Sequence, residues 1–178
     1  MNLVVGVPWW LIGLLALVLC AAAIEDVVRL RISNFTCLGV ILLALAAMAI
    51  HGFPVALWQN AVIFFVILGL GTAAFAGGVL GGGDVKLLAG LGLWMNFSGA
   101  VWLIAAVFIA GGVLALFFIF SRPFRKRRRE ARGKGGNAGI PYGLAIAAGA
   151  LMVFGAQSDV LGAKHERPNP LEFRPLNR

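Results

Sequence analysis

An uncharged stretch in the first half of the chain decides the fold. Residues 32–83 read ISNFTCLGVILLALAAMAIHGFPVALWQNAVIFFVILGLGTAAFAGGVLGGG and contain no Asp, Glu, Lys or Arg. A membrane-spanning helix requires roughly 20 apolar residues, so this stretch has room for two. The His-Gly-Phe-Pro segment at 51–54 divides it, because glycine and proline together mark a turn. We therefore predict helices near 35–51 and 55–76.

The regions on either side of this stretch show the same pattern. They predict four more helices, near 3–24, 84–96, 100–120 and 140–157. A cleaved signal peptide is the competing interpretation of 3–24. That stretch lacks a basic n-region, however, and exceeds the usual ~7–15 apolar residues. Residues 158–178 contain three prolines and are expected to form a flexible tail.

The composition supports a membrane protein. Charged residues make up 12% of the chain and the mean hydropathy is +0.94, whereas ordinary globular domains carry about a quarter charged residues. This composition excludes both a soluble globular fold and a disordered chain. The predicted fold class is an all-α, polytopic membrane protein with about six transmembrane helices, in which residues 1–157 form the membrane domain.

The basic residues indicate orientation. The net charge is +8, and basic residues concentrate in the 25–34 loop, at Lys86 and in the predicted loop 122–134. They are too localised to suggest nucleic acid, and the positive-inside rule makes this side cytoplasmic. Five tryptophans fall at the opposite helix ends, where an interfacial belt is expected: Trp9, Trp10, Trp58, Trp94 and Trp102. Both termini are then non-cytoplasmic, and loop 122–134 is expected to contact anionic lipid.

Two acidic residues are candidates for chemistry. Asp26 ends the first predicted helix and Asp84 begins the fourth, directly after three glycines. A charge at the bilayer centre costs ~2.5–3.5 kcal/mol on insertion scales, so such residues are usually functional. Asp26 could instead be a solvated loop residue, and Asp84 a helix cap. The glycines could serve helix packing alone, or let an extended peptide approach the carboxylate.

The inferred topology brings both acids to one membrane face. Two carboxylates at short range cannot both ionise easily, so the pair would hold one proton. The ionised acid then activates water while the protonated acid polarises a peptide carbonyl, which is general acid–base proteolysis. A small proton-coupled transporter or channel subunit explains the same two acids, but not the glycine run.

Three segments resemble motifs of the type IV prepilin peptidases, which are GxGD membrane aspartic peptidases. Residues 81–89, GGGDVKLLA, resemble the GxGD segment, and residues 140–147, IPYGLAIA, resemble the last-helix motif. Asp26 with the downstream RISN at 31–34 resembles the first aspartate motif, although Ser33 stands where the family often has proline. The resemblance implies Asp26 and Asp84 as the catalytic pair. It also implies a set of motif or substrate-approach residues: Gly81, Gly83, Lys86, Arg31, Asn34, Pro141, Tyr142 and Gly143.

The resemblance further implies an inner-membrane aspartic endopeptidase that removes the basic leader of pilin-like precursors at the cytoplasmic face. Larger members of the family carry a tetracysteine zinc insert and methylate the trimmed pilin. This chain has only two cysteines, Cys20 and Cys37, so we expect cleavage without methylation and no cofactor. The compact form most resembles the peptidases of Flp pili or archaeal preflagellins. A related protease acting on signal-peptide remnants is a further alternative.

Two neighbours of the acids receive simpler interpretations. Consecutive helical residues point about 100° apart, so Glu25 cannot line a site together with Asp26 and is expected to be solvated. Lys86 lies two residues after Asp84 and either acts on that acid or pairs with lipid phosphate, which is the favoured interpretation.

Overall fold

The computed structural model describes residues 2–4, 6–52, 55–130 and 142–165, and for 121–130 and 158–165 it describes the backbone only. Almost all of these residues are helical. No strand occurs among these residues, so the predicted all-α fold is confirmed. The elements in chain order are α1 Trp9–Arg29, α2 Asn34–Ile50, the 3-10 helix η1 Val55–Leu57, α3 Trp58–Ala76, α4 Gly82–Gly92, α5 Phe97–Glu130 and α6 Tyr142–His165.

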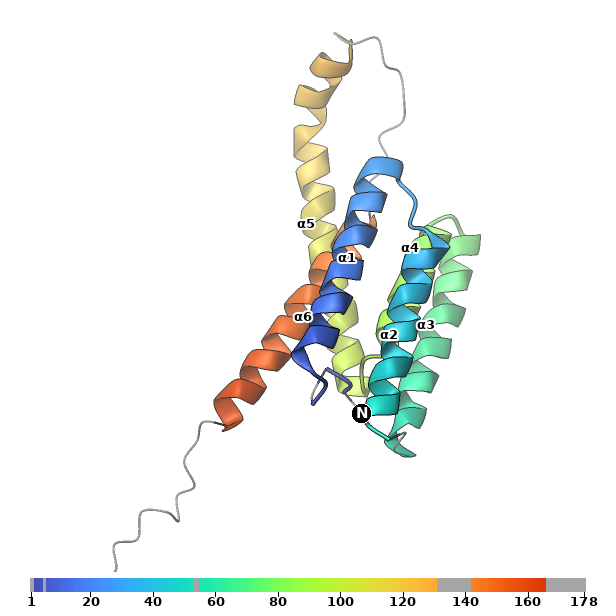
Figure 1. Cartoon of the computed structure of the whole chain (residues 1–178). Coiled ribbons are helices and arrows are strands. Elements are labelled where there is room, and N and C mark those ends of the chain that lie inside the picture. The colour runs from blue at the N-terminus through green and yellow to red at the C-terminus, as the bar shows by residue number, and fades with distance from the viewer. Residues whose placement is uncertain (1, 5, 53–54, 131–141, 166–178) are drawn as a thin grey trace, which may run out of the picture.

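The helices form two groups (Figure 1). α1, α5 and α6 pack together on one side, α2, α3 and α4 pack on the other, and α1–α2 and α4–α6 contacts join them. Three segments are long and apolar enough to cross a membrane, namely Trp9–Arg29, Val55–Ala76 and Phe97–Phe120. Two shorter apolar helices accompany them, Asn34–Ile50 and Tyr142–Gln157. By length and composition, the fold is that of a membrane protein.

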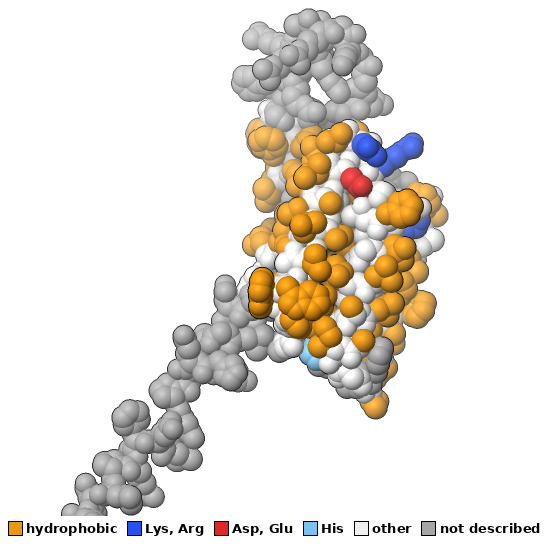
Figure 2. Space-filling view, viewed as in Figure 1, with side chains coloured by type: hydrophobic (Ala, Val, Ile, Leu, Met, Phe, Trp, Pro, Cys, Tyr) orange, Lys and Arg blue, Asp and Glu red, His pale blue; other side chains and the backbone are white. Residues whose placement is uncertain are grey.

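Hydrophobic side chains cover the sides of the helices. Figure 2 shows them spread over one face, with Lys and Arg gathered at the end where α1 finishes. The described Lys and Arg side chains are Arg29, Arg31 and Lys86, and all three are exposed. In the apolar part of α5, Phe97–Phe120, only 6% of the most apolar 18-residue stretch is buried inside the protein. A soluble protein rarely exposes so large an apolar surface, so these sides face lipid.

The first helix begins later than the sequence suggested. We expected a helix near 3–24, but α1 runs from Trp9 to Arg29. Gly6 has a positive φ of 86° and Pro8 takes the N-cap position, so the chain turns before the helix starts. The segment before this turn packs inward, because Leu3 is fully buried and its N–H donates to the Trp94 carbonyl at 2.9 Å.

The α4 helix is short and lies at the centre of the bundle. It has 11 residues, which at 1.5 Å per residue span about half of a ~30 Å hydrocarbon core. Its C-terminal carbonyls are satisfied inside the protein, because Asn60 Nδ2 donates to the Leu93 carbonyl at 2.8 Å. Trp94 is 0% exposed and donates through Nε1 to the Val40 carbonyl. Our placement of Trp94 in an interfacial belt was therefore wrong, whereas Trp9, at 84% exposed, does face outward.

Glycines allow neighbouring helices to approach α4 closely. A Cβ at Gly71 of α3 would lie 2.6 Å from the side chain of Val85. On α4 itself, a Cβ at Gly90 would lie 3.3 Å from Ile41, and one at Gly92 would lie 3.0 Å from Ile63. Small residues are the usual means of close helix packing in membranes. These contacts fix α4 between α2 and α3.

The last two helices extend beyond their predicted ends. α5 continues to Glu130, so the predicted basic loop 122–134 starts as helix, and α6 continues to His165, into the predicted tail. The rest of that loop and tail, 131–141 and 166–178, lies outside the described residues. α5 and α6 meet closely at Gly149, where a Cβ would lie 2.8 Å from the Val107 nitrogen. Cavities open between the two helices on either side of this contact.

Candidate active site

Asp84 is positioned by the glycines that precede it. Gly81 is the N-cap of α4 with an extended backbone, which places Asp84 at the third helical position. The Asp84 carboxylate accepts a hydrogen bond from the Gly81 N–H, as the third residue of a capping box does. Asp84 is only 9% exposed, and its Oδ1 is buried without a hydrogen-bond partner among the described atoms. One carboxylate oxygen is thus held while the other is available.

A cavity of about 330 Å³ adjoins Asp84. It lies between α4, α5 and α6, and Asp84 is the one carboxylic acid among the described residues that line it. The other lining residues are apolar or glycine, apart from Tyr142: Leu80, Leu88, Ile104, Val107, Phe108, Gly111, Gly112, Ala115, Ala145 and Ile146. An apolar pocket with one convergent polar group is a typical small-ligand or side-chain site.

Asp26 lies in the last turn of α1 and is 5% exposed. Its Oδ2 accepts the Gly143 N–H at 2.6 Å, and the carboxylate also accepts the Leu144 N–H. These N–H groups belong to the first turn of α6, where the helix dipole favours a negative charge. The charge of Asp26 acts on Asp84, so the two acids are electrostatically coupled. The structure thereby brings together the two acids that the sequence singled out.

Ile32 lies between the segments that carry the two acids. A Cβ at Gly83 would lie 3.0 Å from Ile32 Cβ and 3.1 Å from its carbonyl oxygen. A Cβ at Gly143 would lie 2.7 Å from Ile32 Cδ1 and 2.9 Å from Asp26 Oδ2. Gly83 and Gly143 are therefore close-approach positions, as expected for motif glycines. Ile32 itself escaped the sequence analysis, because an apolar residue in an apolar chain carries no signal.

The other predicted motif residues lie around this centre. Lys86 is exposed, and its Nζ donates to Asn34 Oδ1 at 2.8 Å, which links α4 to α2. We had expected Lys86 to act on Asp84 or to bind lipid, and this bond was not foreseen. Arg31 is exposed in the connection between α1 and α2, and Tyr142 lines the cavity. Pro141 lies outside the described residues.

Glu25 is partly exposed, as a solvated residue would be, but it also makes hydrogen bonds that we did not expect. Its Oε2 accepts hydrogen bonds from the Ser33 N–H and from Thr36 Oγ1, both at 2.9 Å. Ser33, which replaces the proline expected at this position, is the N-cap of α2 and accepts the Thr36 N–H at 3.2 Å. Glu25 and Asp26 point in different directions from α1, as expected for consecutive helical residues. The direction of Glu25 did not indicate that it would face the first turn of α2.

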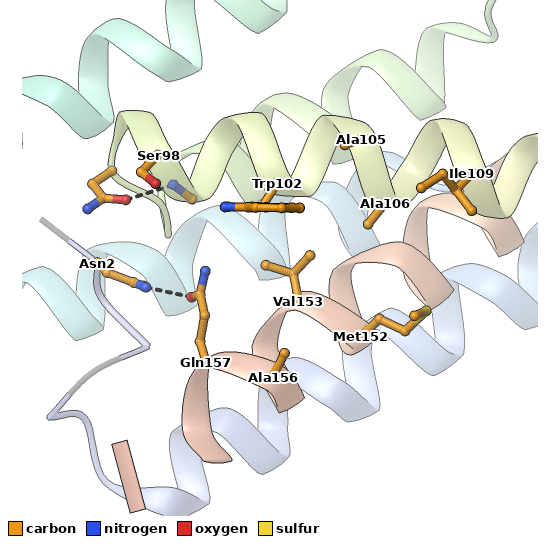
Figure 3. A pocket seen from close by; sticks show the side chains of 12 residues that line it. Asn2, Ser98, Trp102, Ala105, Ala106, Ile109, Met152, Val153, Ala156 and Gln157 are labelled. Carbon is orange, nitrogen blue, oxygen red and sulfur yellow. Dashed lines mark hydrogen bonds between the residues drawn. The ribbon is translucent and has the colours of Figure 1, made fainter. Parts of the chain in front are cut away.

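A second cavity lies away from the acids. It measures about 690 Å³ and lies between α5, α6 and the segment before α1 (Figure 3). Asn2 donates to Gln157 at 2.5 Å across its floor, and Trp102 points into it. None of the described residues that line this cavity is acidic. Within the part of the chain that the structure describes, His, Cys, Asp and Glu form no group of three suited to a metal ion.

Comparison with known families agrees with this geometry. The family model described as "Type IV leader peptidase family" matches residues 13–119 of the 178-residue chain, a range that includes both Asp26 and Asp84. Neither the curated proteins nor the solved structures gave a match. The match covers more than half of the sequence and takes in the α1–α4 core around the two buried acids. This chain belongs to the type IV leader peptidase family.

Proposed function

We propose that this leader peptidase uses Asp26 and Asp84 as an acid–base pair to cleave pilin-like precursors after their basic leader. The observation that carries the proposal is the unpartnered Oδ1 of buried Asp84 beside an apolar cavity, within electrostatic reach of Asp26. Membership of the family supports peptidase chemistry over a proton-coupled transporter, which two buried acids alone would also fit.

The two acids are suited to different parts of the reaction. Burial disfavours the charged form of Asp26, but two backbone N–H groups at the start of α6 stabilise that form and offset part of the cost of burial. Asp84 has a free oxygen in an apolar setting, which favours its protonated form. In the proposed step, the charged acid takes a proton from the attacking water. The protonated acid donates to the carbonyl oxygen of the scissile peptide bond, so the pair keeps one proton throughout.

The proposed location is the inner (plasma) membrane, with the acids at the cytoplasmic face and both termini on the other side. The exposed Arg29, Arg31 and Lys86 at this end support that orientation under the positive-inside rule. The basic run within 122–134 would then meet anionic cytoplasmic lipid. A scissile bond held at the cytoplasmic edge of the membrane fits the apolar character of the cavity beside Asp84.

The proposed substrate is a Flp-like prepilin, and the proposed product is unmethylated. The experiment is co-expression of the chain with such a precursor, with leader removal followed by gel mobility and the mature N-terminus analysed by mass spectrometry. We expect cleavage and a free N-terminal amine. A gain of one methyl group that depends on this chain alone would contradict the second part. Exchanging the prepilin for an ordinary signal peptide separates the proposal from a protease of signal-peptide remnants.

A further inference from the structure

Glu25 makes the contacts that fasten the connection between α1 and α2. This connection, residues 30–33, joins the end of α1 to the start of α2. A single oxygen of Glu25 accepts from the Ser33 backbone and from the Thr36 hydroxyl, at 2.9 Å each. The same hydroxyl lies 2.9 Å from Ser33 Oγ. The carboxylate of one helix thus holds the first turn of the next.

The connection needs such a fastening because its backbone is strained. Leu30 has φ 53° and ψ 34°, the left-handed conformation, which side chains with a Cβ adopt unfavourably. A residue in this region keeps its conformation only where the surrounding contacts impose it. The Leu30 N–H donates to the Asp26 carbonyl at 2.8 Å, so the strained turn begins directly at the candidate catalytic residue.

The connection also sets the spacing of the candidate site. Two residues after Leu30, Ile32 fills the space between Gly83 and Gly143, so a Cβ at Gly83 would press on it at 3.0 Å and one at Gly143 would overlap with it at 2.7 Å. Gly83 precedes Asp84 on α4, and Gly143 donates to Asp26 from α6. A shift of Ile32 would therefore move both acids relative to each other.

We propose that Glu25 is a positioning residue for leader cleavage: its carboxylate oxygen fixes the 30–33 connection, and Ile32 thereby holds α4 and α6 at the separation that the Asp26–Asp84 pair requires. This inference rests on the proposed function of the pair. It requires an acceptor oxygen at position 25 rather than a negative charge, because both partners are hydrogen-bond donors. It therefore separates two substitutions that a solvated Glu25 would tolerate equally.

The first test compares Glu25→Ala with Glu25→Gln in the full chain, in membranes, on a Flp-like prepilin. Glutamine keeps an acceptor oxygen and alanine does not. We expect Glu25→Ala to lower kcat by about tenfold or more with KM little changed, since ångström-scale misplacement of catalytic groups can cost up to ~100-fold. Glu25→Gln should stay within about threefold of the parent, because its acceptor oxygen replaces the lost one. Thr72→Ala, which removes a hydroxyl bonded within exposed α3, is the matched control.

The second test does not depend on activity. Cys37 is buried in the first turn of α2, and its thiol lies 3.6 Å from the Gly83 carbonyl, so it reports on the fit of α2 against α4. In a Cys20→Ala background, Cys37 becomes the single thiol, and its reaction with a membrane-permeant maleimide can be timed. We expect faster labelling with Glu25→Ala and parental labelling with Glu25→Gln and Thr72→Ala.

The outcomes separate this inference from the proposed function. Slower turnover and faster Cys37 labelling in Glu25→Ala, but not in Glu25→Gln, would support the positioning role. Alanine and glutamine variants with equal turnover and equal labelling would overturn it, even if Asp26 and Asp84 proved essential. If the parent chain failed to cleave the prepilin, the proposed function would fall, and the thiol rates alone would decide whether Glu25 fixes the connection.

Discussion

The carboxylate oxygens of Asp26 and Asp84 differ in their hydrogen-bond partners, yet the proposed reaction needs both acids. Asp26→Asn and Asp84→Asn keep nearly the same volume and remove the acid–base function. We expect each to lower cleavage by about 10²–10⁴-fold, the usual contribution of general acid–base catalysis. Leader removal at matched membrane levels of each variant measures this. Near-parental processing by Asp26→Asn would remove Asp26 from the pair.

Gly83 and Gly82 provide a second comparison of single residues. A methyl group at Gly83 would press on Ile32 backbone atoms at 3.1–3.3 Å, whereas one at Gly82 would lie 3.4 Å from the ring of Phe75. The first contact is tighter than ordinary packing and cannot be relieved by a side-chain rotation. We expect Gly83→Ala to reduce cleavage strongly and Gly82→Ala to be tolerated, in a time course at matched expression. Equal activity of Gly83→Ala and the parent would mean that Ile32 yields without disturbing the acids.

The sequence identifies some of these residues and not others, for physical reasons. Asp26 and Asp84 stand out because carboxylates are rare and costly in apolar chains, and the structure does bury them together. Glu25 and Ile32 could not be recognised in this way. Their contacts depend on the left-handed turn at Leu30, and a leucine gives no indication of that conformation.

On the scale of helices, the cavity beside Asp84 depends on a glycine in α5. Gly112 lines the cavity, and a Cβ there would have no atom within 4 Å. Gly112→Leu should fill the space next to Asp84 and sharply reduce cleavage without unfolding the protein. Gly69→Leu is the matched control, since Gly69 is exposed on α3 and also has open space around its Cβ position. The comparison is of initial cleavage rates at equal membrane levels. Unchanged rates for Gly112→Leu would show that substrate does not use this cavity.

Helix ends were harder to predict than helices. α2 ends at Ile50 and the next helix begins at Val55, as expected from the glycine and proline between them, which interrupt both hydrophobicity and helix geometry. The charged residues after 121, by contrast, did not mark the end of α5, which continues to Glu130. Arg, Lys and Glu are good helix formers, so a charged run indicates where a helix leaves lipid and not where it ends.

For the whole molecule, the proposed orientation makes a direct prediction. Reporter fusions after Arg132 should read cytoplasmic, and fusions after Pro54 and Gly162 should read non-cytoplasmic, because most of the basic residues flank one set of helix ends and those of the C-terminal tail are accompanied by acidic residues. The fusions after Arg132 and Gly162 together determine whether α6 crosses the membrane. A cytoplasmic reading after Gly162 would contradict the proposed orientation of the C-terminus.

The short length of α4, about half of what is needed to cross a bilayer, has a consequence for proton leakage through the protein. A peptidase that admits water to acids within the bilayer risks becoming a proton leak. In the proposed orientation, the helix that carries Asp84 would end about midway across the bilayer. The residues beyond its end are buried inside the protein, namely Trp94, Met95 and the inward-folded Leu3 and Val4. Water is expelled from such apolar constrictions, so a chain of water molecules entering beside Asp84 would end inside the protein. If the proposed site and orientation hold, the short helix and the apolar residues below it would keep the membrane closed to protons while the peptide is hydrolysed.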